Sequence, residues 1–521
     1  MTVHGISPSN APERELVRKL GLASATFLVM GNVIGSGIFI VSADIARLVD
    51  SPALLIGAWL VTGLMTMIGA LAYGELAAMM PRAGGQYVYL RESLGPIWGF
   101  LYGWTLFLVI QTGTIAAVGV GFGKFLGVFF PWISSSNWVM HIAHVPAVRV
   151  GPMVLGNMDV GLNTQNAVAI VVIGMLTVVN VFGVKVGAAV QNVFTVAKSA
   201  ALLGLVFLGL FIGRNAQALA ANFGPNFWRN FGMHVLHPVE VGVTGPVVLV
   251  GMITIVAIAQ VGSLFSADAW NNVTFTAGEI RNPQRNLPLS LAVGAGAVIV
   301  LYLLANLAYL SVLPLAGDAH GRTIVARGIQ YASEDRVATA VVQQVLGPIG
   351  GKIMALAILV SCFGCINGMI LAGARVYYAM AADGLFFKSA GQIHTGYGTP
   401  ARSLIMQCIW TCILCISGSY GQLLDYIVFA VLVFYILTIS GLFVLRRTQP
   451  TAIRPYRALG YPVLPAVYIF MAVFIDLALL RYKPQYTFPG LFIVVLGIPV
   501  YFLWSRSKNA PKSGSASVEP V

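Results

Sequence analysis

The chain has 521 residues, of which 58% are hydrophobic and 9% are charged, and its mean hydropathy is +0.84. Such a composition is typical of an integral membrane protein and excludes a soluble enzyme or a soluble nucleic-acid-binding domain. The net charge of +13 is therefore expected in loops at the membrane surfaces. The sequence contains neither an HExxH motif nor a P-loop, so it does not indicate a zinc protease or an ATP-driven pump.

Apolar stretches long enough to cross a bilayer occur along almost the whole chain. We predict twelve membrane spans, at about 23–45, 53–80, 97–130, 164–183, 187–213, 246–275, 287–313, 348–382, 402–418, 421–445, 464–482 and 487–505. They form one transmembrane domain at 21–506, preceded by a polar segment at 1–20 and followed by a disordered tail at 507–521. A cleaved signal peptide is not expected, because the first apolar stretch follows the polar segment directly.

The loops differ in charge on the two sides of the membrane. An even number of spans places both ends of the chain on one side. Lys and Arg are more numerous in the loops on that side, which are also shorter; they include Arg82, Arg91, Arg285, Arg446 and Arg457. The positive-inside rule therefore predicts cytoplasmic N- and C-termini.

Two apolar stretches are interrupted at matching places. The first is broken by Gly35-Ser36-Gly37, and the sixth is broken by small and polar residues between Phe265 and Asn271. Non-helical backbone at membrane depth is tolerated only where it is buried in protein or lines a wet cavity. Paired interruptions of this kind indicate a secondary transporter built from two repeats, which we expect at 21–213 and 246–446. Five spans per repeat give the repeats opposite orientations, and the helices at 464–505 lie outside them.

A broken helix offers backbone groups to a ligand. Its new start presents free amides and its new end presents free carbonyls, each reinforced by a half-helix dipole. We expect the amides of Ser36, Gly37 and Ile38 to suit a carboxylate, since Gly35 and Gly37 lack a Cβ that would block approach. Carbonyls suited to an ammonium group come from Val33 and Ile34 in the first break and from Phe265, Ser266 and Ala267 in the second. This pairing fits an α-amino acid; the alternative is that Gly-Ser-Gly is a small-residue packing face.

Four motifs resemble those of a known family. They are GNVIGSGIF at 31–39, PRAGGQY at 81–87, WN at 270–271 with EIRNPQRNLP at 279–288, and SCFGCING at 361–368. The first resembles the first-helix signature of the amino acid–polyamine–organocation (APC) superfamily. The others resemble its L-type amino acid transporter (LAT) branch, prokaryotic type. The resemblance runs from about residue 15 to 505.

The resemblance implies an all-α LeuT-type fold, with a 5+5 inverted repeat, two additional C-terminal helices and discontinuous helices 1 and 6. It implies sodium-independent exchange of neutral or cationic L-amino acids by alternating access, without a cofactor. It also supports Ser36 and Gly37 at the substrate carboxylate, with the carbonyls of Val33, Ile34 and Phe265 at the amine. Phe265 would in addition gate the substrate, and Asn271 would shape the pocket.

Lys198 lies near the middle of the fifth span. A charge at that depth costs about 3 kcal/mol or more unless it is paired. One interpretation is an ammonium that bonds to carbonyls and holds helices together. The resemblance adds a second, in which Lys198 stands where related carriers bind a sodium ion.

Asp268 departs from the commonest LAT pattern, which has a small residue in this break. It could be the N-cap of a half-helix that begins near Ala269. It could instead face the substrate and attract an ammonium group, as in LAT members that carry dibasic as well as neutral amino acids. A third interpretation is a proton-coupling carboxylate.

Several further residues have both a functional and a structural interpretation. Glu75 and Glu279, near the cytoplasmic ends of their spans, could pair with arginines in a gate or be solvated helix ends. The candidate arginines are Arg82, Arg281 and Arg285. Three other side chains could line the pocket or pack between helices: Trp104, Gln111 and Tyr426.

Rival functions and partners are constrained by what the sequence contains. Proton-coupled symport through Glu75, Asp268 or Asp425 is the main alternative, followed by a channel or sensor on the same fold. All five cysteines lie in predicted spans, so we expect neither an external disulfide nor a metal site. No cysteine lies between Gly121 and Gly161, where eukaryotic relatives join a glycoprotein. We therefore expect a monomer in a bacterial plasma membrane, in contact with lipid and amino acid only.

Overall fold

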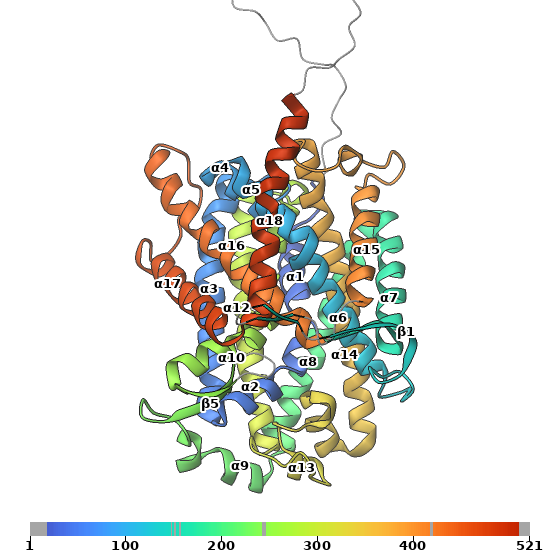
Figure 1. Cartoon of the computed structure of the whole chain (residues 1–521), viewed down its shortest axis with the longest axis vertical. Helices are drawn as coiled ribbons and strands as arrows, with labels where there is room; N and C mark the ends of the chain where they lie inside the picture. Colours follow the sequence, from blue (N-terminus) through green and yellow to red (C-terminus); the bar gives the residue numbers. More distant parts are fainter. Residues whose placement is uncertain are drawn as a thin grey trace, which may run out of the picture.

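The structure, a computed structural model, describes residues 18–509 apart from 147, 151–152, 156–157, 242–245 and 417–419. Its long helices run side by side along one axis (Figure 1). They are α3 (Pro52–Met79), α5 (Pro96–Thr105), α6 (Gln111–Leu126), α7 (Thr164–Val181), α8 (Val184–Phe207), α12 (Pro283–Val312), α14 (Val337–Ala382), α15 (Ala401–Ile416), α16 (Tyr420–Thr448), α17 (Val463–Tyr482) and α18 (Pro484–Asn509). Turns of π-helix at Leu106–Ile110 and Leu208–Ile212 join α5 to α6 and extend α8.

Two membrane-spanning segments consist of two helical parts each. The first is α1 (Leu22–Val33) followed by α2 (Ser42–Val49), and the second is α10 (Met252–Ser266) followed by α11 (Asn272–Phe275). Shorter helices connect the long ones: α4 (Gln86–Leu94), α9 (Ala216–Asn222) and α13 (Ile324–Arg327). Turns of 3-10 helix occur at Gly37–Phe39, Gly224–Trp228, Ala277–Glu279, Ser333–Asp335 and Lys388–Gly391.

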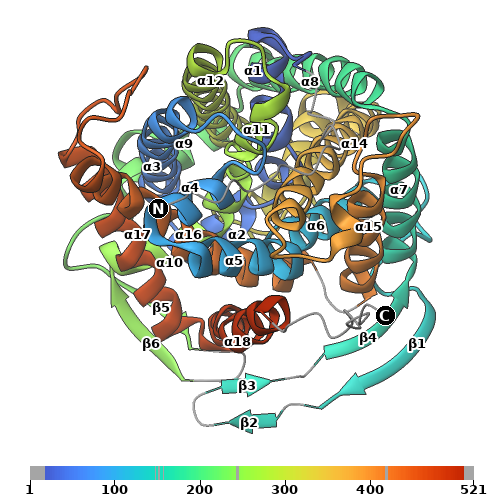
Figure 2. The ribbon, with the colours of Figure 1, turned by 90° about the horizontal axis from the view of Figure 1, so that it is seen from above.

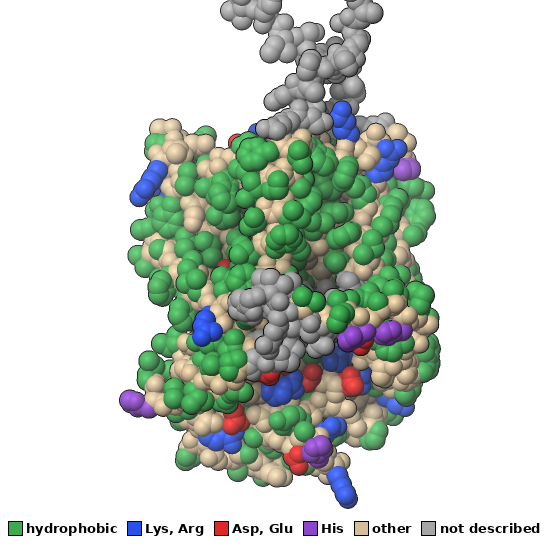
Figure 3. Space-filling view, in the orientation of Figure 1, with side chains coloured by type: hydrophobic (Ala, Val, Ile, Leu, Met, Phe, Trp, Pro, Cys, Tyr) green, Lys and Arg blue, Asp and Glu red, His purple; other side chains and the backbone are tan. Residues whose placement is uncertain are grey.

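The helices have the length and composition of membrane spans. Within the described residues, nine helices are long and apolar enough to cross a membrane, and α1, α10 and α15 are shorter apolar helices. α1 and α10 are short because each is only the first part of an interrupted segment. Apolar side chains such as Val171, Val193 and Phe470 are exposed. Apolar side chains cover the sides of the bundle, whereas charged side chains lie mainly toward its ends (Figure 3). This distribution is the one that lipid requires.

The interior is formed by helices that pack closely in pairs. α12 packs along α3 and α1, and α14 packs along α8 and α6.

Local sequence signals start several helices. Pro52 occupies the first turn of α3 after Ser51, whose hydroxyl accepts from the Leu54 amide at 3.4 Å. The Asn163 side chain caps α7 in the same way, accepting from the Asn166 amide at 2.8 Å.

Three antiparallel hairpins, which the sequence did not predict, lie outside the helices (Figure 2). Their strands are β1 (Trp138–Val145), β2 (Val148–Val150), β3 (Met153–Leu155), β4 (Met158–Asn163), β5 (Leu236–Glu240) and β6 (Val247–Gly251), paired β1–β4, β2–β3 and β5–β6. β5 alternates in burial, with His237 and Val239 facing inward. The predicted span at 246–275 was wrong at its start, because 247–251 form β6 and the helix begins at Met252.

The long loop at 314–346 contains helical structure. α13 lies within it, and α14 begins at Val337 and continues through a kink at Gly347, where φ is 71°, into the predicted span. At the opposite end of the bundle, α4 begins within the PRAGGQY motif, at Gln86. The chain enters α1 and leaves α18 at this same end (Figure 1).

Candidate functional site

The two interrupted segments touch each other at their breaks. α1 ends at Val33, and the chain restarts in a 3-10 turn at Gly37–Phe39. A Cβ atom built on Gly37 would lie only 2.3 Å from Oγ of Ser266, the last residue of α10. Only glycine fits at this contact. The breaks identified from the sequence are therefore both real and adjacent.

The carbonyl end of α1 is held by hydroxyl side chains from two other helices, α12 and α14. The Tyr302 hydroxyl of α12 lies 3.1 Å from the Val33 carbonyl. The Ser361 hydroxyl of α14 lies 3.1 Å from the Ile34 carbonyl and 3.2 Å from that of Gly35. These donors satisfy the groups that a helix end leaves without intrahelical partners.

Lys198 supplies a positive charge to the same carbonyl end. Its side chain is fully buried, and Nζ donates to the carbonyls of Gly31 at 2.5 Å and Ile34 at 2.8 Å. A longer contact of 3.5 Å reaches the Ser361 carbonyl. Lys198 thus bridges α8, α1 and α14 through backbone carbonyls, which is the helix-linking arrangement considered from the sequence. Its equivalence to a sodium ion stays a prediction.

The amide end of the first break starts the next helical turn. Phe39 N–H donates to the Ser36 carbonyl at 3.1 Å and Ile40 N–H donates to that of Gly37 at 2.9 Å. The amides of Ser36, Gly37 and Ile38 precede these donors, at the start of this helical turn. Ser36, Gly37 and Ile38 are all buried.

The second break is shaped by one backbone hydrogen bond and one contact from a tyrosine side chain. Asp268 N–H donates to the Phe265 carbonyl at 3.2 Å, and the Tyr302 hydroxyl lies 3.1 Å from the Ser266 carbonyl. Tyr302 therefore contacts both breaks. Ala269 adopts a left-handed φ of 63°, which turns the chain between α10 and α11. Phe265 is buried beside the break.

Asp268 lies at the wall of two small cavities. Its Oδ1 accepts a hydrogen bond from the Tyr435 hydroxyl of α16 at 2.6 Å. The N-cap interpretation was wrong, because α11 begins at Asn272, well beyond Ala269. Asp268 and Tyr435 line both cavities.

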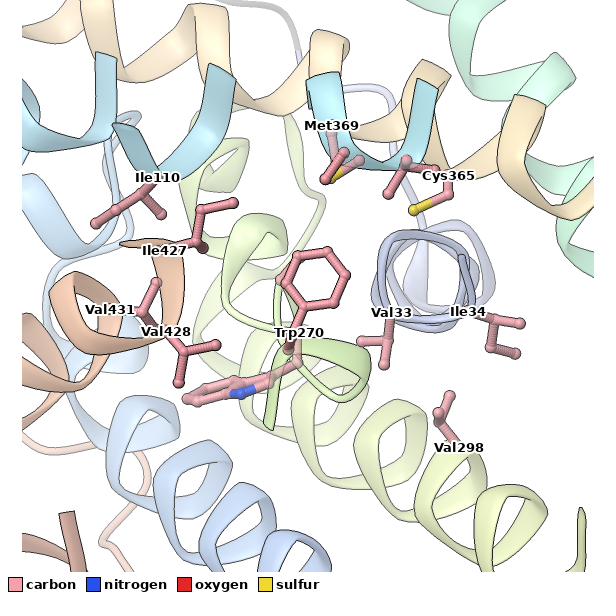
Figure 4. Packing of buried hydrophobic residues seen from close by; sticks show 14 of the residues in the cluster. Val33, Ile34, Ile110, Trp270, Val298, Cys365, Met369, Ile427, Val428 and Val431 are labelled. Atoms are coloured by element: carbon pink, nitrogen blue, oxygen red, sulfur yellow. The ribbon is translucent and has the colours of Figure 1, made fainter. Parts of the chain in front are cut away.

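We name the cavities after the helix that distinguishes each. The α6-side cavity is lined mainly by polar residues, among them Gln86, Tyr102, Gln111, Thr114 and Asn271. The α17-side cavity is lined mainly by apolar and aromatic residues, among them Met65, Leu264, Trp270, Leu432 and Tyr468. Figure 4 shows Trp270 extending toward Val428 of α16.

Polar side chains fix the wall of the α6-side cavity. Asn271 Nδ2 donates to Gln86 Oε1 at 2.8 Å, and Gln86 Nε2 donates to the Thr438 hydroxyl at 3.0 Å. Gln111 Nε2 donates to the Met369 carbonyl at 2.8 Å. Asn271 and Gln111 thus both lie at a cavity wall, as the sequence suggested.

Other candidate lining residues lie elsewhere. Trp104 points away, donating from Nε1 to the Ile493 carbonyl of α18 at 3.0 Å. The side chains of Asp425 and Tyr426 are outside the described residues. Sequence reasoning missed Tyr302 and Tyr435, although a tyrosine inside an apolar span signals a hydroxyl that needs a partner.

Buried acidic residues close the end of the bundle that carries α4. Glu75 of α3 accepts from Arg446 at 2.6 and 3.0 Å and lies 3.3 Å from Arg454. Glu279 lies 3.3 Å from Arg375 of α14, and both side chains are buried. The predicted pairing of these glutamates with Arg82, Arg281 or Arg285 was wrong, because arginines distant in sequence reach them instead.

Both ends of the site are closed in this structure. At the α4 end, the amides of Lys19 and Leu20 donate to the Glu279 carbonyl at 2.8 and 2.9 Å. At the other end, Arg47 of α2 pairs with Asp335 at 2.7 Å and also donates to the Gln330 carbonyl. The cavities at the breaks therefore lie between two sets of closing contacts.

The chain is similar to known proteins along almost its whole length. A family model described as amino acid permease matches residues 20–499. The serine/threonine exchanger SteT of Bacillus subtilis is 26% identical over 495 residues, 95% of this chain and 98% of that protein. The b(0,+)-type amino acid transporter 1 of Rattus norvegicus is 29% identical over 512 residues, 97% of this chain and 91% of that protein.

A third relative also matches almost the whole chain. The large neutral amino acids transporter small subunit 2 of Homo sapiens is 27% identical over 507 residues, 97% of this chain and 83% of that protein. The family model covers both helix breaks, Lys198 and the helices from α1 to α17. The chain therefore belongs to the amino acid permease family of the APC superfamily, is similar to its LAT-type members, and is a membrane transporter of amino acids rather than an enzyme.

Proposed function

We propose that this transporter exchanges amino acids across the membrane, one for one, by alternating access and without sodium. The observation that carries the proposal is the contact between the two helix breaks. Their helix ends supply positive and negative backbone dipoles within one buried region, beside cavities that are closed at both ends. An α-amino acid offers the matching carboxylate and ammonium groups. The names of the relatives, which include an exchanger and amino acid transporters, support the same reading.

The substrate groups have separate proposed sites. The carboxylate binds the amides of Ser36, Gly37 and Ile38. The ammonium binds carbonyls of Val33, Ile34, Phe265, Ser266 or Ala267, where Lys198 and Ser361 share the Ile34 carbonyl. Lys198 replaces a sodium ion at the carbonyl end of α1 and keeps this region in register. Phe265 closes over the substrate.

The proposed architecture is the LeuT type. Two inverted repeats at 21–213 and 246–446 each begin with an interrupted segment, and the helices at 464–505 lie outside them. Both termini are cytoplasmic, and the protein works as a monomer in a bacterial plasma membrane without a disulfide-linked partner. Single cysteines introduced at either end, labelled with an impermeant maleimide on intact cells, test the orientation.

Efflux from proteoliposomes tests the function. Vesicles loaded with a radiolabelled amino acid are diluted into buffer with and without a panel of unlabelled amino acids. Efflux that requires an external amino acid supports obligatory exchange. Equal efflux into empty buffer contradicts exchange. Uphill uptake driven by a pH gradient into vesicles without internal amino acid would instead support proton symport, for which the partly buried Asp268 is the available carboxylate at the cavities.

A further inference from the structure

A groove of about 540 Å³ lies between α3, α10 and α17, with Phe231 at its edge. It shares none of the residues that line the two small cavities at the breaks. Gly57 of α3 lies in its wall, and a Cβ atom built on Gly57 would meet nothing within 4 Å. The glycine therefore leaves part of the groove open where most residues would fill it.

The lining of the groove is almost wholly apolar. Among the described residues that line it, Gln260 is the only polar side chain. Gln260 is fully buried, and its carboxamide accepts from the Thr62 hydroxyl at 2.7 Å and donates to the Ala58 carbonyl at 3.3 Å. A bound water molecule needs about three polar partners. The groove therefore suits hydrocarbon rather than water or a polar solute.

The groove is continuous with the apolar side of the bundle. Two side chains of its lining are among the exposed apolar residues, Ile253 at 55% and Phe470 at 73%. α17 packs against both α3 and α10, and it lies at the periphery of the bundle (Figure 2). In a chain that spans a membrane, such an exposed apolar surface faces lipid. Lipid thus has direct access to the groove.

The groove has the depth of one membrane leaflet. It includes Leu54 in the first turn of α3 and Met252, the first residue of α10. Both helices begin toward the end of the bundle opposite α4 (Figure 1). From Met252 to Gln260, α10 rises about 12 Å. One leaflet has about 15 Å of hydrocarbon, half of the bilayer core.

Arginines lie near this same end of the groove. Arg481 is in the last turn of α17, beyond the lining residue Ile475, and it is exposed. Arg229 precedes Phe231 by two positions, is exposed, and pairs with Asp50 at 2.8 Å. Guanidinium groups are well suited to bind phosphate. An acyl chain in the groove would therefore have its phosphate close to positive charge.

We propose that this groove binds one acyl chain of a phospholipid, with the phosphate held near Arg481 and Arg229. A chain in the groove packs against α3, α10 and α17 together, so it makes more dispersion contacts than a chain on the open surface of one helix. Since α10 ends at the second break, the bound chain lies against the half-helix that leads to the substrate region. The inference goes beyond amino acid exchange and does not depend on it.

Photolabelling in nanodiscs tests the site. The full chain is placed in phosphatidylglycerol nanodiscs that contain a small share of the same lipid with a diazirine midway along one acyl chain. After illumination, mass spectrometry of peptides gives the ratio of label in α10 to label in α8, a helix that lies away from α17 (Figure 2). The unmodified protein should carry more label in α10 than in α8.

Variants of one glycine show whether the groove is responsible. Gly57→Trp fills the open space and should lower the α10-to-α8 ratio about tenfold, because losing about ten carbon–carbon contacts weakens a bound chain by about this factor. Gly57→Ala leaves most of the groove open and should change the ratio less than about twofold, since few of these contacts are lost. Gly174→Trp on α7, where an added Cβ also meets nothing within 4 Å, is the matched control and should not lower the ratio.

Val61→Phe adds bulk to the same groove from a second position. It replaces Gly57→Trp if that variant fails to give a single peak in size-exclusion chromatography.

Three outcomes would overturn the site. The first is equal labelling of α10 and α8 in the unmodified protein, and the second is an unchanged ratio in Gly57→Trp. The third is a dimer whose α10 is protected from label, because a second copy of the chain would then cover the groove. Labelling does not require transport, so a protein that fails to exchange amino acids would contradict the proposed function and leave this test intact.

Discussion

The two helix breaks lie against each other, yet the protein surrounds them differently. In the first break, the carbonyls of Val33, Ile34 and Gly35 already accept from Tyr302, Lys198 and Ser361. In the second break, Asp268 and Asn271 line cavities and face other side chains across them. The first region is therefore fixed from several helices, whereas the second has free space beside it.

This difference suggests that the two breaks have separate roles in substrate binding. Every α-amino acid presents the same carboxylate and ammonium, so the region that binds them gains from being rigid and pre-organised. Side chains vary between substrates, so the region that meets them needs space and a few placed polar groups. Changes in the first break should then harm all substrates alike. Changes in the second should alter the preference among substrates.

The largest effect is expected at Gly37. Gly37→Val places a side chain within 3 Å of Ser266, which forces the two breaks apart. A displacement of about 1 Å at a binding site can cost about 100-fold in rate, so exchange of every amino acid should fall by about this factor or more. Initial rates of exchange in proteoliposomes measure the effect. Gly174→Ala, whose added Cβ would meet nothing within 4 Å, is the control, and a Gly37→Val protein with normal kinetics would contradict the proposed contact.

The second largest effect is expected at Lys198. Lys198→Met removes the cation from the carbonyls of Gly31 and Ile34 and leaves them buried without this donor. Losing a buried charged partner costs about 3 kcal/mol or more, equivalent to about 100-fold. Exchange should fall for neutral and cationic substrates alike. Lys388→Met, at an exposed lysine, should have no effect.

Sodium dependence of a Lys198→Ala variant tests whether the lysine replaces a sodium ion. If Lys198 stands in for a sodium ion, then Lys198→Ala leaves room and carbonyls for one, and transport by that variant should become sodium-dependent. Transport by the unmodified protein should be equal in sodium and in choline buffers. A Lys198→Ala protein that stays inactive in both buffers would leave only the helix-linking interpretation.

Ser361 should have a moderate effect that is again uniform across substrates. Ser361→Ala removes the hydroxyl that lies near the Ile34 and Gly35 carbonyls. A net loss of about 1 kcal/mol per hydrogen bond predicts a fall in kcat/KM of about fivefold to tenfold. Leucine and serine exchange should decline in the same proportion. Ser93→Ala removes a hydroxyl that donates to the Tyr89 carbonyl of its own helix and serves as the control. A change in substrate ratio on Ser361→Ala would contradict separate roles for the two breaks.

The backbone features of the site could be predicted from the sequence. Gly35, Ser36 and Gly37 mark the first break because glycine and serine interrupt an otherwise apolar span. Ser266 and Asp268 mark the second for the same reason, and Lys198 stands out as a charge at membrane depth. Helix positions followed from apolar length, except where a strand replaced the start of a predicted span at 247–251.

The side-chain partners could not be predicted, because they come from distant parts of the chain. Tyr435 reaches Asp268 across 167 positions, and Arg446 reaches Glu75 across 371. A single sequence shows that a buried glutamate needs a partner but not which arginine supplies it. The pairing of β1 with β4 was missed for a different reason. The exposed strand β1 carries apolar residues on both faces, so it lacks the alternation that indicates a strand.

Asn271 should produce the smallest effect and the most selective one. Its side chain donates to Gln86 and lines the α6-side cavity, so Asn271→Ala enlarges that cavity and frees Gln86 without touching the first break. Loss of one such hydrogen bond predicts a change in KM of about threefold to tenfold. The sign should differ between substrates. Small polar amino acids that use the amide should bind more weakly, whereas bulky ones that use the space should bind equally well or more tightly. Measuring KM for serine and leucine in Asn271→Ala, Gln86→Ala and the double variant separates the two causes. Non-additive effects on serine would assign the change to the Asn271–Gln86 contact, since residues that share a hydrogen bond couple in this way. Equal losses of affinity for serine and leucine would instead contradict the idea that the second break sets the preference among substrates.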